Sequence, residues 1–175
     1  MDVRDPRPGD LEALLAFFAS VPEHERTFFK EDVTDRDAVA ATLTAERGRR
    51  ALADPGDGSV AGYVAVMPLG GWSDHVGEVR LVVAPGHRGA GVGRALARRA
   101  LLDALQCGLR KLVVEVVAEQ EGAVGMFQAL GFRAEGLLRD HVRDHDGTLR
   151  DLVILAHPVA EQWEAMATIG IGAEL

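Results

Sequence analysis

The segment from Val82 to Arg94, VVAPGHRGAGVGR, constrains the fold of this chain more than any other part of the sequence. An apolar strand ends there, a turn passes through Gly89, Gly91 and Gly93, and a basic helix begins. Glycine lets the backbone approach a ligand closely and adopt dihedral angles that other residues avoid. The first N–H groups of a helix lack partners within it and lie at the positive end of its dipole. The segment predicts a site for an anion such as a pyrophosphate; the alternative is a glycine-rich turn before an exposed basic helix.

Two well-known phosphate-binding loops do not fit the spacing of these glycines. A Walker-type loop ends in Gly-Lys followed by Ser or Thr, whereas Gly93 is followed by Arg94 and Ala95. The dinucleotide-binding fingerprint places its last two glycines three residues apart, whereas Gly91 and Gly93 are two apart. Both loops are therefore excluded.

Composition limits the possible partners. Acidic residues outnumber basic ones by 27 to 19, which argues against a nucleic-acid or membrane-surface protein, because phosphate contacts need an excess of Lys and Arg. The charge is uneven, since six basic residues and one acid lie between Gly86 and Lys111. Cys107 cannot form an internal disulfide, no stretch approaches the roughly 18 apolar residues of a membrane span, and the N-terminus does not resemble a signal peptide. We expect one domain over residues 1–175, cytoplasmic, with no nucleic-acid or membrane partner.

Hydrophobic periodicity and turn residues predict the order strand, helix, helix, three strands, helix, strand, helix and two strands. Asp10 is placed to cap the first helix, and Thr34 with Asp37 resembles a capping box for the second. Residues 21–33 are expected to form a loop. The predicted strands are Val3–Arg4, 51–54, 59–67, 76–84, 111–117, 133–143 and 148–156; the predicted helices run from Leu11 to Pro22, from Thr34 to about Arg47, from about Gly91 to Gln106 and from about Glu121 to Leu130, with a weakly helical tail after Pro158.

The strand, helix and strand between Val76 and Val117 predict a crossover that joins parallel strands, and such connections are right-handed. The other neighbouring strands can pair as antiparallel hairpins. We therefore predict an α/β fold with a mixed, mostly antiparallel sheet, a central parallel β-α-β crossover and flanking helices.

The run Arg88-Gly89-Ala90-Gly91-Val92-Gly93 resembles the R/Q-x-x-G-x-G/A signature of the GCN5-related N-acetyltransferases (GNAT), and the preceding Val-x-Pro is also present. Residues 108–117 and Gly131-Phe132 look like the next strand of that family and the end of its short helix. The resemblance covers almost the whole chain. Residues 135–155 are similar to the branch that contains ribosomal-protein N-terminal and polyamine acetyltransferases.

The resemblance implies that acetyl-CoA is a cosubstrate. Backbone N–H groups of the glycine-rich turn would hold its pyrophosphate, and the exposed edge of the strand at Leu81–Val83 would pair with its pantetheine. That strand would splay from 111–117, and a backbone N–H near Val83 would face the acyl carbonyl. The resemblance assigns the cofactor-binding role to Leu81, Val82, Val83, Arg88, Gly89, Ala90, Gly91, Val92, Gly93, Arg94, Gln120 and Phe127.

Two residues bear on catalysis. Glu78 stands where several family members carry a glutamate base, and a base must deprotonate an ammonium of pKa near 10 before it can attack; the alternative is that Glu78 pairs with Arg80. Phe127 stands where the family commonly has a tyrosine that protonates the departing thiolate, and it cannot donate a proton. Tyr63 is the one tyrosine of the chain, on an earlier strand, and we expect it to be packed.

These observations predict an acetyl-CoA-dependent N-acetyltransferase that works by direct attack of a primary amine: a small amine, an amino acid or a protein N-terminus. The alternative is a non-catalytic acyl-CoA-binding or sensing module. A third hypothesis, a nucleotide-binding protein, requires that ATP or NAD binds and CoA does not. The acceptor pocket is expected between residues 21–33 and 139–150. We expect no metal at His141 and His145, and a homodimer is possible.

Overall fold

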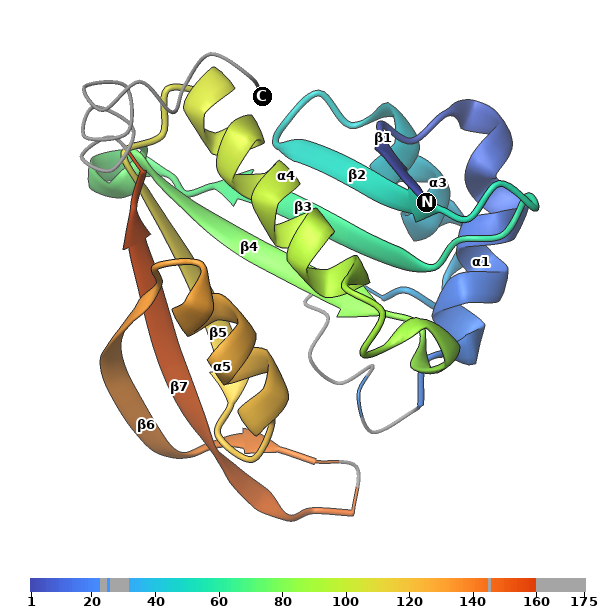
Figure 1. Ribbon diagram of the computed structural model, residues 1–175. Helices are drawn as coiled ribbons and strands as arrows, with labels where there is room; N and C mark the ends of the chain where they lie inside the picture. Colours follow the sequence, from blue (N-terminus) through green and yellow to red (C-terminus); the bar gives the residue numbers. More distant parts are fainter. Residues whose placement is uncertain (23–24, 26–31, 145, 160–175) are drawn as a thin grey trace.

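The computed structural model describes residues 1–22, 25, 32–144 and 146–159. Its sheet has seven strands in the order β1-β2-β3-β4-β5-β7-β6. Among the described strands, only β4 and β5 pair in parallel, and α4 connects them (Figure 1), so the predicted fold class is confirmed. The strands are β1 (Asp2–Arg4), β2 (Arg49–Asp54), β3 (Gly62–Pro68), β4 (Val76–Val83), β5 (Lys111–Val117), β6 (Arg133–Arg143) and β7 (Leu149–Pro158); the helices are α1 (Leu11–Ser20), α3 (Arg36–Thr44), α4 (Val92–Gln106) and α5 (Glu121–Ala129), with single turns η1 (Pro8–Asp10), η2 (Gly71–Ser73) and η3 (Pro85–His87).

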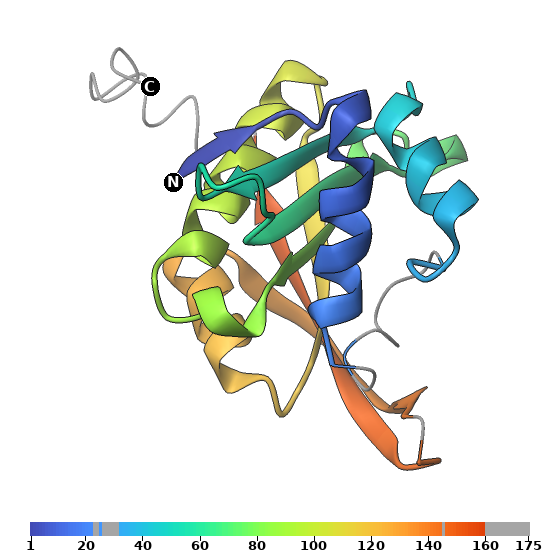
Figure 2. The same ribbon diagram turned by 90° about the vertical axis from the view of Figure 1, so that its right-hand side faces the viewer.

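Helices cover both faces of the sheet. The helix α4 lies on one face, and α1 and α3 lie on the other (Figure 2). Leu96, Ala100 and Ala104 recur at helical spacing along α4, and all three are buried in the first hydrophobic core. The second core lies beneath α1 and α3 and includes Leu14 and Tyr63. The two faces of β4 therefore meet different surroundings.

The strands β4 and β5 pair over only part of their length. Their register runs from Val76 opposite Lys111 to Val79 opposite Val114. Beyond this point β5 continues to Val117 with β7 as its partner, while β4 continues with β3 alone. The divergence implied by the family resemblance is therefore confirmed. It leaves the last residues of β4 without a strand on that side.

Helix caps are the main local error of the sequence predictions. Asp35, not Thr34, is the N-cap of α3, and its carboxylate accepts a hydrogen bond from the Asp37 N–H, while the Thr34 N–H and hydroxyl both donate to Asp32. Asp10 is the N-cap of α1 but makes no side-chain cap bond there; its carboxylate accepts from the Arg4 guanidinium and from the Arg7 N–H instead. These short polar residues have several possible partners, and their spacing alone does not select one.

Element ends differ by a few residues from those predicted. The helix α3 ends at Thr44 instead of near Arg47, β2 begins at Arg49 and β3 begins at Gly62. Most of the predicted loop at 21–33 and the tail after residue 159 lie outside the described residues. Among the helices that the structure describes, none is both long and apolar enough to cross a bilayer.

Candidate active site

The glycine-rich turn lies between β4 and α4. Gly89 and Gly91 have φ angles of +74° and +83°, and Gly91 is the N-cap of α4. A side chain would be strained at these angles, which explains the choice of glycine. A Cβ atom added at either position would meet nothing within 4 Å, so both positions face open space.

The same turn presents a row of available backbone donors. Within the described part of the chain, none of the N–H groups from Gly89 to Arg94 donates to a protein acceptor, and the first bond of this region runs from the Ala95 N–H to Gly91. These donors lie at the positive end of the α4 dipole. The arrangement fits a ligand that carries phosphate groups.

The side chain of Arg88 does not face an open anion site. Its Nη1 and Nη2 donate to the two oxygens of Glu25 at 2.9 and 2.5 Å, and its Nε donates to the Val83 carbonyl at 3.2 Å. In this structure the guanidinium of Arg88 is therefore paired with protein groups and is not open to a polyanion. Arg94 and Arg98 are exposed on α4.

The open end of β4 offers backbone groups to a ligand. The Ala84 N–H donates to the Ala61 carbonyl at 2.9 Å, so it faces the β3 side. Because successive N–H groups of a strand alternate in direction, Leu81 and Val83 direct theirs toward the side that β5 has left. Both side chains pack against the first core, and Val82 packs against the second.

Glu78 lies where the two strands begin to diverge. It is 8% exposed, and it is opposite Met67 of β3 and Val113 of β5. Arg80 donates from Nε and Nη2 to its carboxylate at 3.4 and 3.3 Å. The structure thus contains the ion pair with Arg80 that was the alternative to a catalytic role for Glu78, and both side chains lie on the α1 and α3 face of the sheet.

The expected pantetheine contacts on α5 differ in accessibility. Gln120 is the half-buried N-cap of α5, just after β5. Phe127 is 3% exposed, and its ring packs against Phe132 at a centroid distance of 5.1 Å. The structure places Phe127 in the first core, so it does not support the expected contact of this ring with a cofactor.

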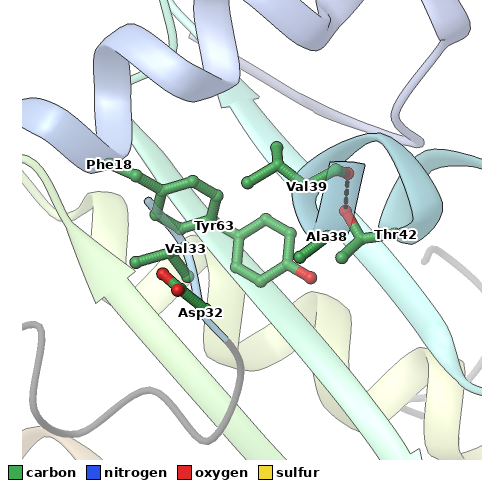
Figure 3. Close-up of a pocket in the computed structure, with 7 residues that line it drawn as sticks. All are labelled: Phe18, Asp32, Val33, Ala38, Val39, Thr42 and Tyr63. Atoms are coloured by element: carbon green, nitrogen blue, oxygen red, sulfur yellow. Dashed lines mark hydrogen bonds between the residues drawn. The ribbon is translucent and has the colours of Figure 1, made fainter. Parts of the chain in front are cut away.

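Tyr63 is packed, as predicted. It is 7% exposed and makes an edge contact with Phe18 at 5.5 Å. Beside it lies a small pocket of about 20 Å³, room for a single water molecule (Figure 3). The pocket is lined by Phe18, Asp32, Val33, Ala38, Val39, Thr42 and Tyr63.

The β6–β7 hairpin, where the acceptor was expected, contains a backbone irregularity. The register shifts between Leu138 and Val142, and Asp140 has a φ angle of +52°. The Asp140 N–H donates to Asp151 at 2.9 Å, which holds the bulge. His141 is exposed and His145 lies outside the described residues; those residues contain no cluster of three or more His, Cys, Asp or Glu side chains suited to a metal.

Sequence reasoning missed the pair between Glu25 and Arg88. The two residues are 63 positions apart, and neither belongs to a pattern that relates them. Glu25 lies in the range 21–33, where one side of the acceptor pocket was expected. No single-sequence signal identifies its partner.

Comparisons with known proteins agree with this geometry. A family model described as the acetyltransferase (GNAT) family matches residues 13–132. The chain is 29% identical to streptothricin acetyltransferase of Streptomyces lavendulae, over 78% of this chain and 83% of that protein. It is 26% identical to the L-amino acid N-acyltransferase MnaT of Escherichia coli, over 75% of this chain and 79% of that protein.

Solved structures show the same fold. A GCN5-related N-acetyltransferase from Kribbella flavida has a TM-score of 0.74 and 29% identity, and the match covers 90% of this chain and 96% of that one. An acetyltransferase from Salmonella typhimurium, solved with its cofactor acetyl-CoA, has a TM-score of 0.78 and 20% identity, over 91% of this chain and 94% of that one. The family match spans β4, the glycine-rich turn and α4. The chain therefore belongs to the GNAT family of acetyltransferases.

Proposed function

We propose that this protein is an acetyl-CoA-dependent N-acetyltransferase whose acceptor is a small molecule with a primary amine and a nearby anionic group. The observation that carries the proposal is the juxtaposition of open backbone donors at the end of β4 with a buried carboxylate at Glu78. The backbone donors could hold an acyl donor, and the Glu78 carboxylate could accept a proton from the amine. Both lie where β4 parts from β5.

The donor side uses backbone groups. The N–H groups from Gly89 to Arg94 would hold the pyrophosphate, and the edge of β4 at Leu81 and Val83 would pair with the pantetheine. Gln120, the N-cap of α5, would add a hydrogen bond to the pantetheine. Acetyl-CoA, when bound, supplies the acetyl group as an activated thioester.

The acceptor side uses Glu78 and Arg80. Glu78 would take a proton from the ammonium group of the acceptor, because only the free amine can attack the thioester carbonyl. In the structure Arg80 occupies the carboxylate of Glu78. An acceptor with its own anionic group would draw the Arg80 guanidinium toward itself and leave Glu78 to the amine. The names of two relatives, an L-amino acid N-acyltransferase and an L-methionine sulfoximine acetyltransferase, support an amino-acid-like acceptor.

Departure of the thiolate would proceed without a tyrosine acid in this position, because Phe127 cannot donate a proton. A thiol of pKa about 8.5 is a tolerable leaving group, so water can protonate it. Phe127 also favours the second candidate function, a non-catalytic acyl-CoA-binding module. Such a module would bind acyl-CoA in the same way but would not transfer the acyl group.

The test combines binding with transfer. A ligand at about 100 times its Kd stabilises a protein by roughly 2.7 kcal/mol, so acetyl-CoA and CoA should raise the unfolding midpoint while ATP and NAD should not. Acetyl transfer is then measured with pairs of acceptors, each amino acid beside the amine that lacks its carboxylate. Faster transfer to the amino acids is expected. Equal rates within the pairs would contradict the anionic group, binding without any transfer would favour the second candidate, and no CoA binding would refute the proposal.

A further inference from the structure

An ion pair joins Glu25 to Arg88, the first residue of the glycine-rich turn. The carboxylate of Glu25 accepts hydrogen bonds from both terminal nitrogens of Arg88. The side chain of Glu25 is 17% exposed, and that of Arg88 is 45% exposed. A two-point contact of this kind fixes the orientation of the guanidinium as well as its position. The third donor, Nε, binds the Val83 carbonyl at 3.2 Å. One side chain thus connects three separate parts of the chain.

Among the described residues, the Val83 carbonyl has no hydrogen-bond donor other than Arg88. It is the last carbonyl of β4 and points to the side from which β5 has departed. The Ala84 N–H on the other side of the same peptide group donates to Ala61 at 2.9 Å. Arg88 therefore occupies the place of the missing strand and holds this peptide group from the opposite side. That keeps the neighbouring N–H of Val83 directed along the open edge.

The pair also affects charge beside the glycine-rich turn. Arg88 begins this turn, and a free guanidinium there would attract a pyrophosphate. Glu25 neutralises it. The Arg88 guanidinium therefore lies next to the predicted pyrophosphate site, but it is bound to Glu25 and not directed at that site.

We propose that Glu25 is a positioning residue that acts through Arg88. Its carboxylate holds the guanidinium on the Val83 carbonyl, which orients the open edge of β4 for acyl transfer, and it keeps this cation from binding the pyrophosphate of the donor. The proposal rests on the proposed function, because it assigns the open edge to an acyl-CoA. It makes two predictions of opposite sign for a single substitution.

The substitution is Glu25→Gln. Loss of the carboxylate releases the guanidinium toward the pyrophosphate, so the Kd for CoA should fall by about threefold to tenfold at low salt, and the gain should shrink at about 1 M salt, where charges are screened. Loss of the fixed Val83 peptide should lower kcat by about tenfold or more, since small misplacements of reacting groups are costly. A merely structural role would weaken binding and transfer together.

A matched control is Glu12→Gln, which removes another ion pair between a glutamate and an arginine, Arg36, on the exposed surface. It should change neither CoA affinity nor kcat.

A second variant is Arg88→Lys, which keeps the charge but cannot contact Glu25 through two nitrogens and Val83 through a third. It should lower kcat without tightening CoA, so it tests the proposal even if Glu25→Gln folds poorly.

Calorimetric titration with CoA at two salt concentrations gives the affinities, and steady-state kinetics with acetyl-CoA gives kcat and KM. Tighter, more salt-sensitive CoA binding together with slower transfer in Glu25→Gln supports the proposal. Unchanged values, or weaker CoA binding, would overturn it, as would an unaltered kcat in Arg88→Lys. Wild-type protein that binds no CoA refutes the proposed function instead, so the two failures are distinguishable.

Discussion

The first half of β4, Val76 to Val79, and its second half, Arg80 to Val83, have different neighbours. The first half lies between β3 and β5, and all of its residues are buried. The second half pairs with β3 alone, and each of its residues is partly exposed. The change occurs within one strand, between Val79 and Arg80.

The difference shows how one strand can serve both stability and function. Buried backbone groups need hydrogen-bond partners, and in the first half the neighbouring strands supply them. In the second half, the Arg88 guanidinium satisfies one carbonyl, and the N–H groups on that side are open to a ligand. Apart from the carboxylate of Glu78, substitutions in the first half should therefore change stability, and those around the second half should change binding or turnover.

The largest expected effect is at Glu78, the last residue but one of the first half. Glu78→Gln keeps the shape of the side chain and removes its ability to take a proton. We expect kcat to fall by about 10²- to 10⁴-fold, as for loss of a general base, with CoA affinity nearly unchanged. Steady-state kinetics over a range of pH measures the effect, and the rise of rate with pH that depends on this carboxylate should disappear.

Glu46→Gln is the control for this change, since Glu46 is an exposed residue before β2. It should leave the kinetics as in the wild type. An unchanged pH–rate profile in Glu78→Gln would show that Glu78 is not the base.

The second prediction concerns packing in the first half of β4. A Cβ atom at Gly77 would lie 2.7 Å from Leu109 Cδ1 and 2.9 Å from Leu112 Cδ2, both buried side chains. Gly77→Ala should therefore lower the free energy of unfolding by about 1–3 kcal/mol, as overpacking does. Denaturant titration measures the loss.

Gly136→Ala in β6 is the matched control, because the nearest atom to its added Cβ, Ile154 Cδ1, is 3.9 Å away. It should cost far less. The folded fraction of Gly77→Ala should bind CoA as the wild type does; weaker binding would contradict the separation of the two halves.

The order of elements and the glycine-rich turn were predictable from the sequence because they depend on local patterns. The bounds of β5, Lys111–Val117, and the extent of α4 follow from apolar periodicity and from the glycines that flank the helix. The divergence of β4 from β5 came from family resemblance. Periodicity does not encode it, because both strands continue with apolar residues past Val79 and Val114.

Contacts between distant residues were not predictable. Arg4 binds Asp54 across 50 residues and Arg88 binds Glu25 across 63, and in each case several other acids were equally available in sequence. The caps at Asp10 and Thr34 failed for the same reason, since a polar side chain binds whatever partner the fold brings close. The site was therefore predicted at the level of backbone and motif, and missed at the level of side-chain pairing.

The third prediction tests the glycine-rich turn beside the second half of β4. Gly91→Ala meets no atom within 4 Å but must hold a φ angle of +83°, which costs about 1–2 kcal/mol for a residue with a Cβ. Part of this strain should be relieved by a change in the turn, so CoA should bind about tenfold more weakly. Calorimetric titration with CoA measures the affinity.

Gly108→Ala is the matched control, because Gly108 follows the other end of α4, has a φ angle of +70° and also meets nothing within 4 Å. It should cost similar stability without loss of CoA affinity. Equal CoA binding by the two variants would show that the turn holds no part of the donor.

The smallest expected effect concerns Arg4, which binds carboxylates as Arg88 does but should contribute to stability and not to turnover. Arg4 donates to Asp10 and Asp54 at the β1 edge, and these bonds lower the pKa of both carboxyl groups. Such groups stabilise the fold above their unfolded pKa of about 3.9, and this contribution is lost as pH falls through their lower folded pKa.

Arg4→Gln should reduce the unfolding midpoint by about 2–4 °C at pH 7, and its difference from the wild type should fade as the pH is lowered below about 4. Because Arg4 lies away from the open end of β4, kcat should not change, in contrast to Arg88→Lys. Thermal unfolding at several pH values measures the first effect, and a constant difference down to pH 2 would show that these ion pairs do not supply the stabilisation.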